Sequence, residues 1–108
     1  MNSVVIVGRA GQDSDIKYYE SGKVKTSFSV AANRWDSKTK AEVTDWFNVD
    51  VWDKQAEFAG EYVKKGRLVA VEGRIAINKW KDVSGEDRER FLIIANNIRL
   101  LGSKKDEA

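Results

Sequence analysis

The residues best suited to chemistry in this sequence are tryptophans, whose flat indole rings can stack on other planar groups. They are Trp35, Trp46, Trp52 and Trp80. Tryptophan in a strand usually lies in phase with the buried positions, but each of these falls on the polar side of an alternating segment. Trp46, for example, alternates with Phe47 and Val49, which belong to the opposite, apolar face. The spacing therefore predicts an exposed surface built for stacking.

Single-stranded nucleic acid is the partner that such a surface fits. Its bases present flat faces, and stacking of a base on an aromatic ring contributes about 1–3 kcal/mol, whereas a duplex hides those faces. Lysine or arginine lies within a few residues of each tryptophan and can neutralise phosphates. Two alternatives stay open. Single rings can pack internally, with Trp52 at a helix–barrel junction and Trp35 under a loop, or the patch can bind a protein.

The composition excludes several kinds of chemistry. The chain has 108 residues and contains no histidine and no cysteine, so it offers no imidazole base, no thiolate zinc site and no disulfide. We therefore expect neither an enzyme nor a cofactor or metal, although carboxylate or lysine chemistry stays open in principle. The net charge of +2 is too small to indicate a nucleic-acid partner by itself. No apolar run approaches membrane-spanning length, which predicts no membrane partner.

Alternating apolar and polar residues predict that the chain is built mainly of strands. We expect strands over residues 3–9, 16–19, 24–35, 45–52, 68–81, 91–95 and 98–101. The first is a run of β-branched residues without polar alternation, so we expect it to be covered on both faces. Gly73, inside residues 68–81, indicates a bend or bulge. The one expected helix lies between Asp53 as N-cap and Gly66 just past its end.

Many strands with a single intervening helix predict an all-β fold, a small barrel. A helix between strands 3 and 4 of a five-stranded Greek-key barrel is the OB-fold arrangement. An SH3-like barrel or a split ferredoxin-like fold fits less well, and the latter needs a second helix. We expect one domain over residues 1–102, followed by a short polar tail over residues 103–108.

Four sequence blocks, taken in order, resemble one known family. The blocks cover residues 2–13, residues 44–49 with 52–57, residues 61–66 with 71–73, and residues 78–80 with 84–88. They include the sequences Asp-Trp-Phe-Asn, which begins at Asp45, and Tyr-Val-Lys-Lys-Gly, which begins at Tyr62. Over residues 2–102 the chain resembles the bacterial-type single-stranded DNA-binding proteins, most of all the cyanobacterial and plastid-lineage members.

The resemblance implies an OB-fold that assembles, usually as a homotetramer, and wraps single-stranded DNA during replication, recombination and repair. Its base-stacking positions match the same four tryptophans. Its basic contacts match Lys17, Lys38, Lys54, Lys65, Arg74, Lys79 and Arg88. An OB-fold primosomal module, or one that binds RNA or protein, is the alternative. The expected location is the cytoplasm with the nucleoid, or the stroma or matrix of an organelle.

Two departures from the family pattern affect the expected partners. Family members carry an acidic tip that recruits replication and repair proteins, whereas this sequence ends at residues 103–108 without one. Recruitment by that route is therefore not expected. Phe47 stands where several members have histidine, near a contact between subunits.

Overall fold

The computed structural model describes residues 1–102, so the predicted polar tail lies outside the described residues. Its elements, in chain order, are β1 (Val4–Ala10), β2 (Asp15–Tyr18), β3 (Val24–Asp36), β4 (Ala41–Trp52), α1 (Lys54–Tyr62), β5 (Leu68–Lys81) and β6 (Asp87–Leu100). In the described part of the chain, no helix is both long and apolar enough to cross a membrane.

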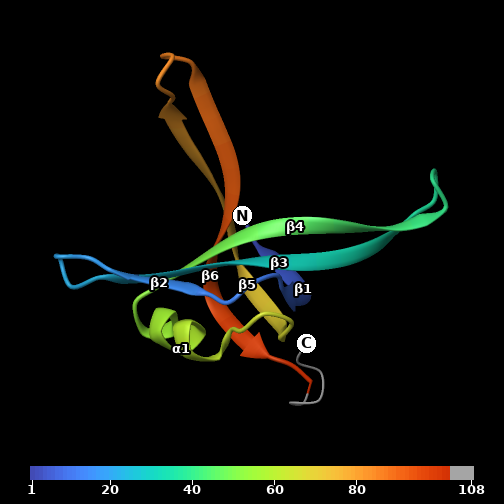
Figure 1. Cartoon of the computed structure of the whole chain (residues 1–108), viewed down its shortest axis with the longest axis horizontal. Coiled ribbons are helices and arrows are strands. Elements are labelled where there is room, and N and C mark those ends of the chain that lie inside the picture. Colours follow the sequence, from blue (N-terminus) through green and yellow to red (C-terminus); the bar gives the residue numbers. More distant parts are fainter. Residues whose placement is uncertain (103–108) are drawn as a thin grey trace.

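Five of the strands close into a barrel (Figure 1). The sheet runs β1-β5-β6-β4-β3, and β1 also pairs with β3, which joins the two ends. The pair β4–β6 is parallel, with Val49 opposite Ile93, and the other pairs are antiparallel. The predicted OB-fold is confirmed. The helix follows the third barrel strand as predicted, although it lies between β4 and β5, because β2 is an extra short strand paired with β3.

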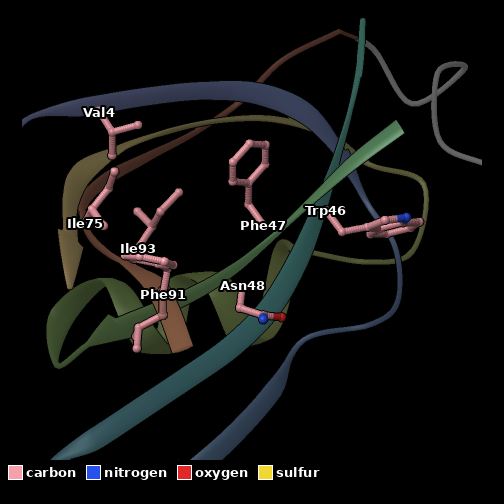
Figure 2. A pocket seen from close by; sticks show the side chains of 8 residues that line it. Val4, Trp46, Phe47, Asn48, Ile75, Phe91 and Ile93 are labelled. Carbon is pink, nitrogen blue, oxygen red and sulfur yellow. The ribbon is translucent and has the colours of Figure 1, made fainter. Parts of the chain in front are cut away.

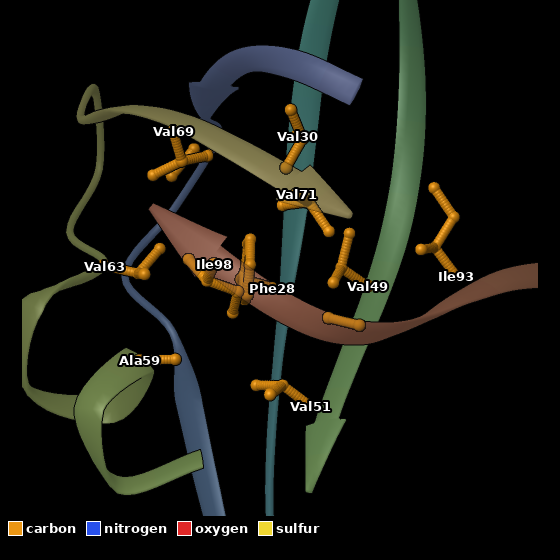
Figure 3. Packing of buried hydrophobic residues seen from close by; sticks show 12 residues of the cluster. Phe28, Val30, Val49, Val51, Ala59, Val63, Val69, Val71, Ile93 and Ile98 are labelled. Atoms are coloured by element: carbon orange, nitrogen blue, oxygen red, sulfur yellow. The ribbon is translucent and has the colours of Figure 1, made fainter. Parts of the chain in front are cut away.

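The barrel core is made of small branched side chains (Figure 3). Val30, Val49, Val69 and Val71 are fully buried at its centre. The helix closes one end of the barrel through Ala59, and Ala59 and Val63, the residue directly after the helix, belong to the same cluster. Burial of these apolar groups supplies most of the stabilisation.

Three hydrogen bonds fix the helix against the rest of the domain. The buried Thr26 hydroxyl of β3 donates to the carbonyl oxygen of Ala56. The Gln55 side-chain oxygen accepts the backbone N–H of Ile98 at 3.0 Å, and the Ser14 hydroxyl donates to the carbonyl of Ala59 at 2.9 Å. Because only Asp53 separates Trp52 from this helix, the bonds also fix the end of β4.

The helix is shorter than predicted. Asp53 precedes it with a φ of 60° and makes no side-chain capping bond, and Val63 is already extended. Lys64 and Lys65 consequently lie beyond the last turn. The backbone follows a tight strand-to-helix turn that the sequence pattern around Asp53 does not reveal.

The prediction that the first strand is covered on both faces is wrong. Val4 and Ile6 lie partly buried against the core, but Val5 is 62% and Val7 51% exposed. The barrel covers only one face of β1, since the single helix packs elsewhere, against β2, β3, β4 and β6.

Two strand pairs continue past the barrel as arms (Figure 1). The β3–β4 pair runs in register from Lys25–Trp52 to Asp36–Ala41, and the β5–β6 pair extends to Lys81–Asp87. The predicted bulge is confirmed as a register shift between Glu72 and Gly73. The predicted strand over residues 68–81 matches β5, but those over 45–52 and 91–95 begin four residues later than β4 and β6 do. The polar residues before them pair across the arms rather than forming loops.

Candidate nucleic-acid interface

Three of the tryptophans lie on one continuous face of the β3–β4 pair. Cross-strand pairing places Trp52 opposite Lys25, Trp46 opposite Ala31, and Trp35 opposite Glu42. Strand alternation puts all of these pairs on the side away from the core. Along the strand, at about 3.4 Å per residue, Trp46 lies about 20 Å from Trp52, and Trp35 about 14 Å further on.

The exposure of the tryptophans confirms their predicted phase. The exposed fractions are 66% for Trp35, 61% for Trp46, 37% for Trp52 and 44% for Trp80. Between the rings of the β3–β4 face lie polar pairs, including Ser27, whose hydroxyl donates to an Asp50 carboxylate oxygen at 2.7 Å. The arrangement is therefore a polar track with aromatic rings standing on it.

The fourth tryptophan stands on the other arm. Trp80 is paired with Arg88 and its neighbour Lys79 with Glu89, near the tip of the β5–β6 hairpin. A polar hollow there is lined by Lys79, Trp80, Asp87, Arg88 and Glu89. The structure thus brings three predicted residues, Lys79, Trp80 and Arg88, to one place.

Arg88 also has a structural role in the hairpin turn. Its Nε donates to the Asp82 carboxylate at 2.8 Å, and the backbone N–H groups of Ser84 and Glu86 donate to the other carboxylate oxygen of Asp82. The Arg88 side chain and these backbone donors hold the pKa of Asp82 below its usual value. The carboxylate stays ionised at neutral pH and keeps the turn closed.

Three of the predicted cations flank the β3–β4 track. Lys17 is exposed on β2, paired with Lys25. Lys38 lies in the turn between β3 and β4, beyond Trp35, with its backbone N–H bonded to the Asp36 carboxylate. Lys54 is the exposed first residue of α1, two residues after Trp52.

The two other predicted cations lie apart from that track. Arg74 is exposed on β5, opposite Ile94 and on the same face as Trp80. Lys65 follows the helix, and its backbone N–H donates to the Asp13 carboxylate in the β1–β2 loop at 2.9 Å. Neither the register nor a hydrogen bond links Lys65 to an arm.

Sequence reasoning missed Tyr19 and Lys25. The Tyr19 ring stacks on Trp52, with centroids 5.6 Å apart and an interplanar angle of 26°. Lys25 lies ten residues before Trp35 in the same alternating segment, hence on the same face, and it pairs with Trp52, so the alternation contained a signal for it. No pattern in the sequence placed Tyr19 there, because it follows the end of a short strand.

Gly11 supports the ring of Trp46 from the β1–β2 loop. A Cβ atom at this glycine would lie 2.3 Å from one Trp46 ring carbon and 2.9 Å from another. Only a residue without a side chain leaves the indole in its place, which makes Gly11 part of the geometry of the site.

An apolar cavity opens on the other side of β4 (Figure 2). Its volume is about 380 Å³, and its lining consists of Val4, Trp46, Phe47, Asn48, Ile75, Phe91, Leu92 and Ile93. Figure 2 shows Val4, Phe47 and Ile75 directed toward one space, while the Trp46 indole points away from it. Phe91 is 63% and Ile75 44% exposed, so the part of this apolar surface that they form is uncovered.

The chain is similar in sequence to a known family and to known proteins. The chain matches the model of the Single-strand binding protein family over residues 1–101. It is 49% identical to single-stranded DNA-binding protein 1 of Synechocystis sp., over all of this chain and 89% of that protein. It is 45% identical to single-stranded DNA-binding protein 1 of Nostoc sp., over 98% of this chain and 87% of that protein.

A solved structure, described as a Plasmodium falciparum SSB complex with ssDNA, shares the fold. The TM-score is 0.85 at 28% identity, over 94% of this chain and 96% of that one. The cyanobacterial relatives agree with the lineage that the sequence blocks predicted. The barrel, the sequence matches and the family model lead to one conclusion: this chain belongs to the single-strand binding protein family.

Proposed function

We propose that residues 1–102 bind single-stranded DNA, largely without sequence preference, and protect strands exposed in replication, recombination and repair. The observation that carries the proposal is the row of Trp35, Trp46 and Trp52 on one outward face, all three accessible to solvent. The names of the cyanobacterial relatives and the DNA complex of the Plasmodium falciparum protein support it. Its place is the compartment that holds the DNA, which is the cytoplasm or the interior of an organelle.

The physical basis of selectivity is the exposed ring face. Every base has such a face, so stacking tolerates any sequence, whereas sequence is read through base edges in a groove. In duplex DNA the bases stack on each other, so no base face is exposed for these rings to contact. Phosphate contacts come from the predicted cations near the two arms, which add a salt-dependent contribution.

Binding of labelled oligonucleotides, followed by fluorescence anisotropy at several salt concentrations, tests the proposal. We expect tight binding of an oligo-dT and weak binding of a duplex of the same length. If all of the predicted cations contact phosphates, the slope of log K against log salt for the single strand is about −5. Equal affinity for duplex and single strand would refute the proposal, and tighter binding of oligo-rU would favour an RNA-binding module.

Substituting Gly11 by alanine is expected to weaken this binding about 5- to 150-fold. The new methyl group collides with the Trp46 ring, so the ring must leave its position and lose its stacked base, which is worth about 1–3 kcal/mol. Anisotropy with oligo-dT measures the loss. In a Trp46→Ala background the same substitution should have almost no further effect, and an undiminished effect there would contradict the role of Gly11.

We also propose that the chain assembles as a homotetramer. A dimer of dimers needs two different self-complementary surfaces, and two uncovered apolar surfaces are present. One is the outer face of β1, with Val5 and Val7. The other is the surface beside the apolar cavity, which includes Phe47, Ile75 and Phe91.

Light scattering tests this assembly. We expect a particle of about four times the 12.2 kDa of the chain. Replacing both Val5 and Val7 by aspartate should halve the mass, since charges on one surface break one interface and leave the other. A monomeric mass for the unmodified chain would refute the assembly.

A further inference from the structure

We propose that Tyr19 and Lys25 belong to the DNA interface, where Tyr19 positions the Trp52 ring and Lys25 contacts a phosphate. With Lys17 and Trp52 they form what we call the β2 cluster. The inference rests on the proposed binding of single-stranded DNA. It assigns a part to β2, the short strand that lies outside the barrel.

The β2 cluster is held in register across three neighbouring strands. Lys17 of β2 pairs with Lys25 of β3, and Lys25 pairs in turn with Trp52 of β4. The three side chains therefore stand in one row on the outward face of the sheet. Tyr19, two residues beyond Lys17, reaches the same row and stacks on the indole.

The stack explains why Trp52 is the least exposed of the tryptophans, at 37%. With centroids at 5.6 Å and an angle of 26°, the Tyr19 ring covers one side of the indole. A base can then approach only the remaining side of Trp52. A ring backed in this way loses less side-chain freedom when a base binds, which favours affinity through preorganisation.

The two lysines of the β2 cluster are directly opposite each other, an arrangement that costs stability because like charges repel. Within residues 1–102 neither forms an ion pair with a carboxylate. Their contacts are to ring faces: the Lys17 ammonium lies 5.3 Å from the Tyr19 centroid, and the Lys25 ammonium 5.9 Å from Tyr19 and 5.7 Å from Trp52. An unneutralised pair of cations beside a stacking ring suits a nucleotide, which carries a base and a phosphate together.

The neighbouring Tyr18 provides a matched comparison. It is 66% exposed and pairs with the buried Val24, so it projects from the opposite face of β2. Lys23 is likewise an exposed lysine in the β2–β3 turn, outside the row. Both residues have the same chemistry as their counterparts in the β2 cluster and a different position.

The test measures oligo-dT affinity by anisotropy for variants of these residues, with melting curves for each. We expect Tyr19→Ala to weaken binding about tenfold and Tyr19→Phe, which keeps the ring stack, to stay within about twofold of the unmodified chain. Tyr18→Ala should also stay within about twofold. In a Trp52→Ala background, Tyr19→Ala should have less than a twofold effect, because Tyr19 acts through Trp52.

The salt dependence tests Lys25 separately. Lys25→Ala should reduce the magnitude of the slope of log K against log salt by about 0.7, the release from one phosphate, whereas Lys23→Ala should leave it unchanged. If the Tyr19→Ala and Lys25→Ala variants bind oligo-dT with the affinity and the salt slope of the unmodified chain, this inference is overturned and the proposed function stays intact. An unmodified chain that fails to bind oligo-dT would overturn both. A Tyr19→Ala loss that persists without Trp52 would overturn the positioning role.

Discussion

Replacing Trp46 and Trp80 together by alanine should weaken binding of single-stranded DNA by roughly 30- to 20,000-fold. Each ring contributes about 1–3 kcal/mol of stacking on a base, and every 1.4 kcal/mol is a factor of ten in affinity. The two rings stand on different strand pairs, Trp46 on β3–β4 and Trp80 on β5–β6, so we expect their contributions to add. The melting temperature should change little, because the side chains are 61% and 44% exposed.

A matched control comes from a second exposed aromatic pair. Phe58 and Tyr62 contact each other on α1, with ring centroids 5.1 Å apart, and are 37% and 48% exposed. Their joint replacement by alanine removes similar aromatic surface outside the interface and should change affinity by less than about twofold. Equal losses in both double variants, or melting of the Trp46 and Trp80 variant at much lower temperature, would show that the tryptophans act through the fold.

Gly8→Ala is expected to damage the fold strongly. The added methyl group would lie 2.2 Å from the Ala31 carbonyl oxygen and 2.8 Å from a Val30 methyl. Next to this point β1 pairs with both neighbouring strands, with Arg9 opposite Leu68 of β5 and Ala31 of β3, and this double pairing closes the barrel. Overpacking costs typically about 1–3 kcal/mol or more, so the melting temperature should fall by about 10 °C or more.

Gly60→Ala separates this close approach from a general effect of losing glycine. At Gly60, in α1, the nearest atom to an added Cβ is the flexible end of Ile16, at 3.0 Å. Alanine also favours the helix by about 1 kcal/mol. Calorimetry should find this variant about as stable as the unmodified chain. A Gly8→Ala variant of undiminished stability would contradict the closure of the barrel through β1 and β3.

Alternation predicted the features that depend on local pattern. The strands, the single helix between the third and fourth barrel strands and the outward phase of the tryptophans follow from which residues are apolar, and the bulge follows from a glycine inside a strand. These predictions hold because a barrel strand has one face toward the core. Thr44 and Asn48, the polar residues two positions before and after Trp46, are on the same face as its ring and indicate that this face is outside.

Features that depend on strand register or on packing between elements could not be predicted from the alternation of apolar and polar residues. The Arg88–Asp82 bond closes a turn. The Tyr19–Trp52 stack joins the residue after β2 to the last residue of β4, on the two sides of β3. The prediction that both faces of β1 are covered was wrong because a run of β-branched residues has the same sequence pattern whether its outer face meets a helix, another subunit or water. The exposure of Ile77 is another such feature. By alternation it lies on the same face as the core residues of β5, but it is 51% exposed because it lies past the end of the barrel.

Intrinsic tryptophan fluorescence during titration with poly-dT tests the central claim most directly, because the proposed contact surface is itself the reporter. We predict strong quenching by poly-dT that weakens as salt is raised, with little response to duplex DNA. An emission spectrum that stays unchanged at saturating poly-dT would contradict stacking of bases on Trp35, Trp46, Trp52 and Trp80.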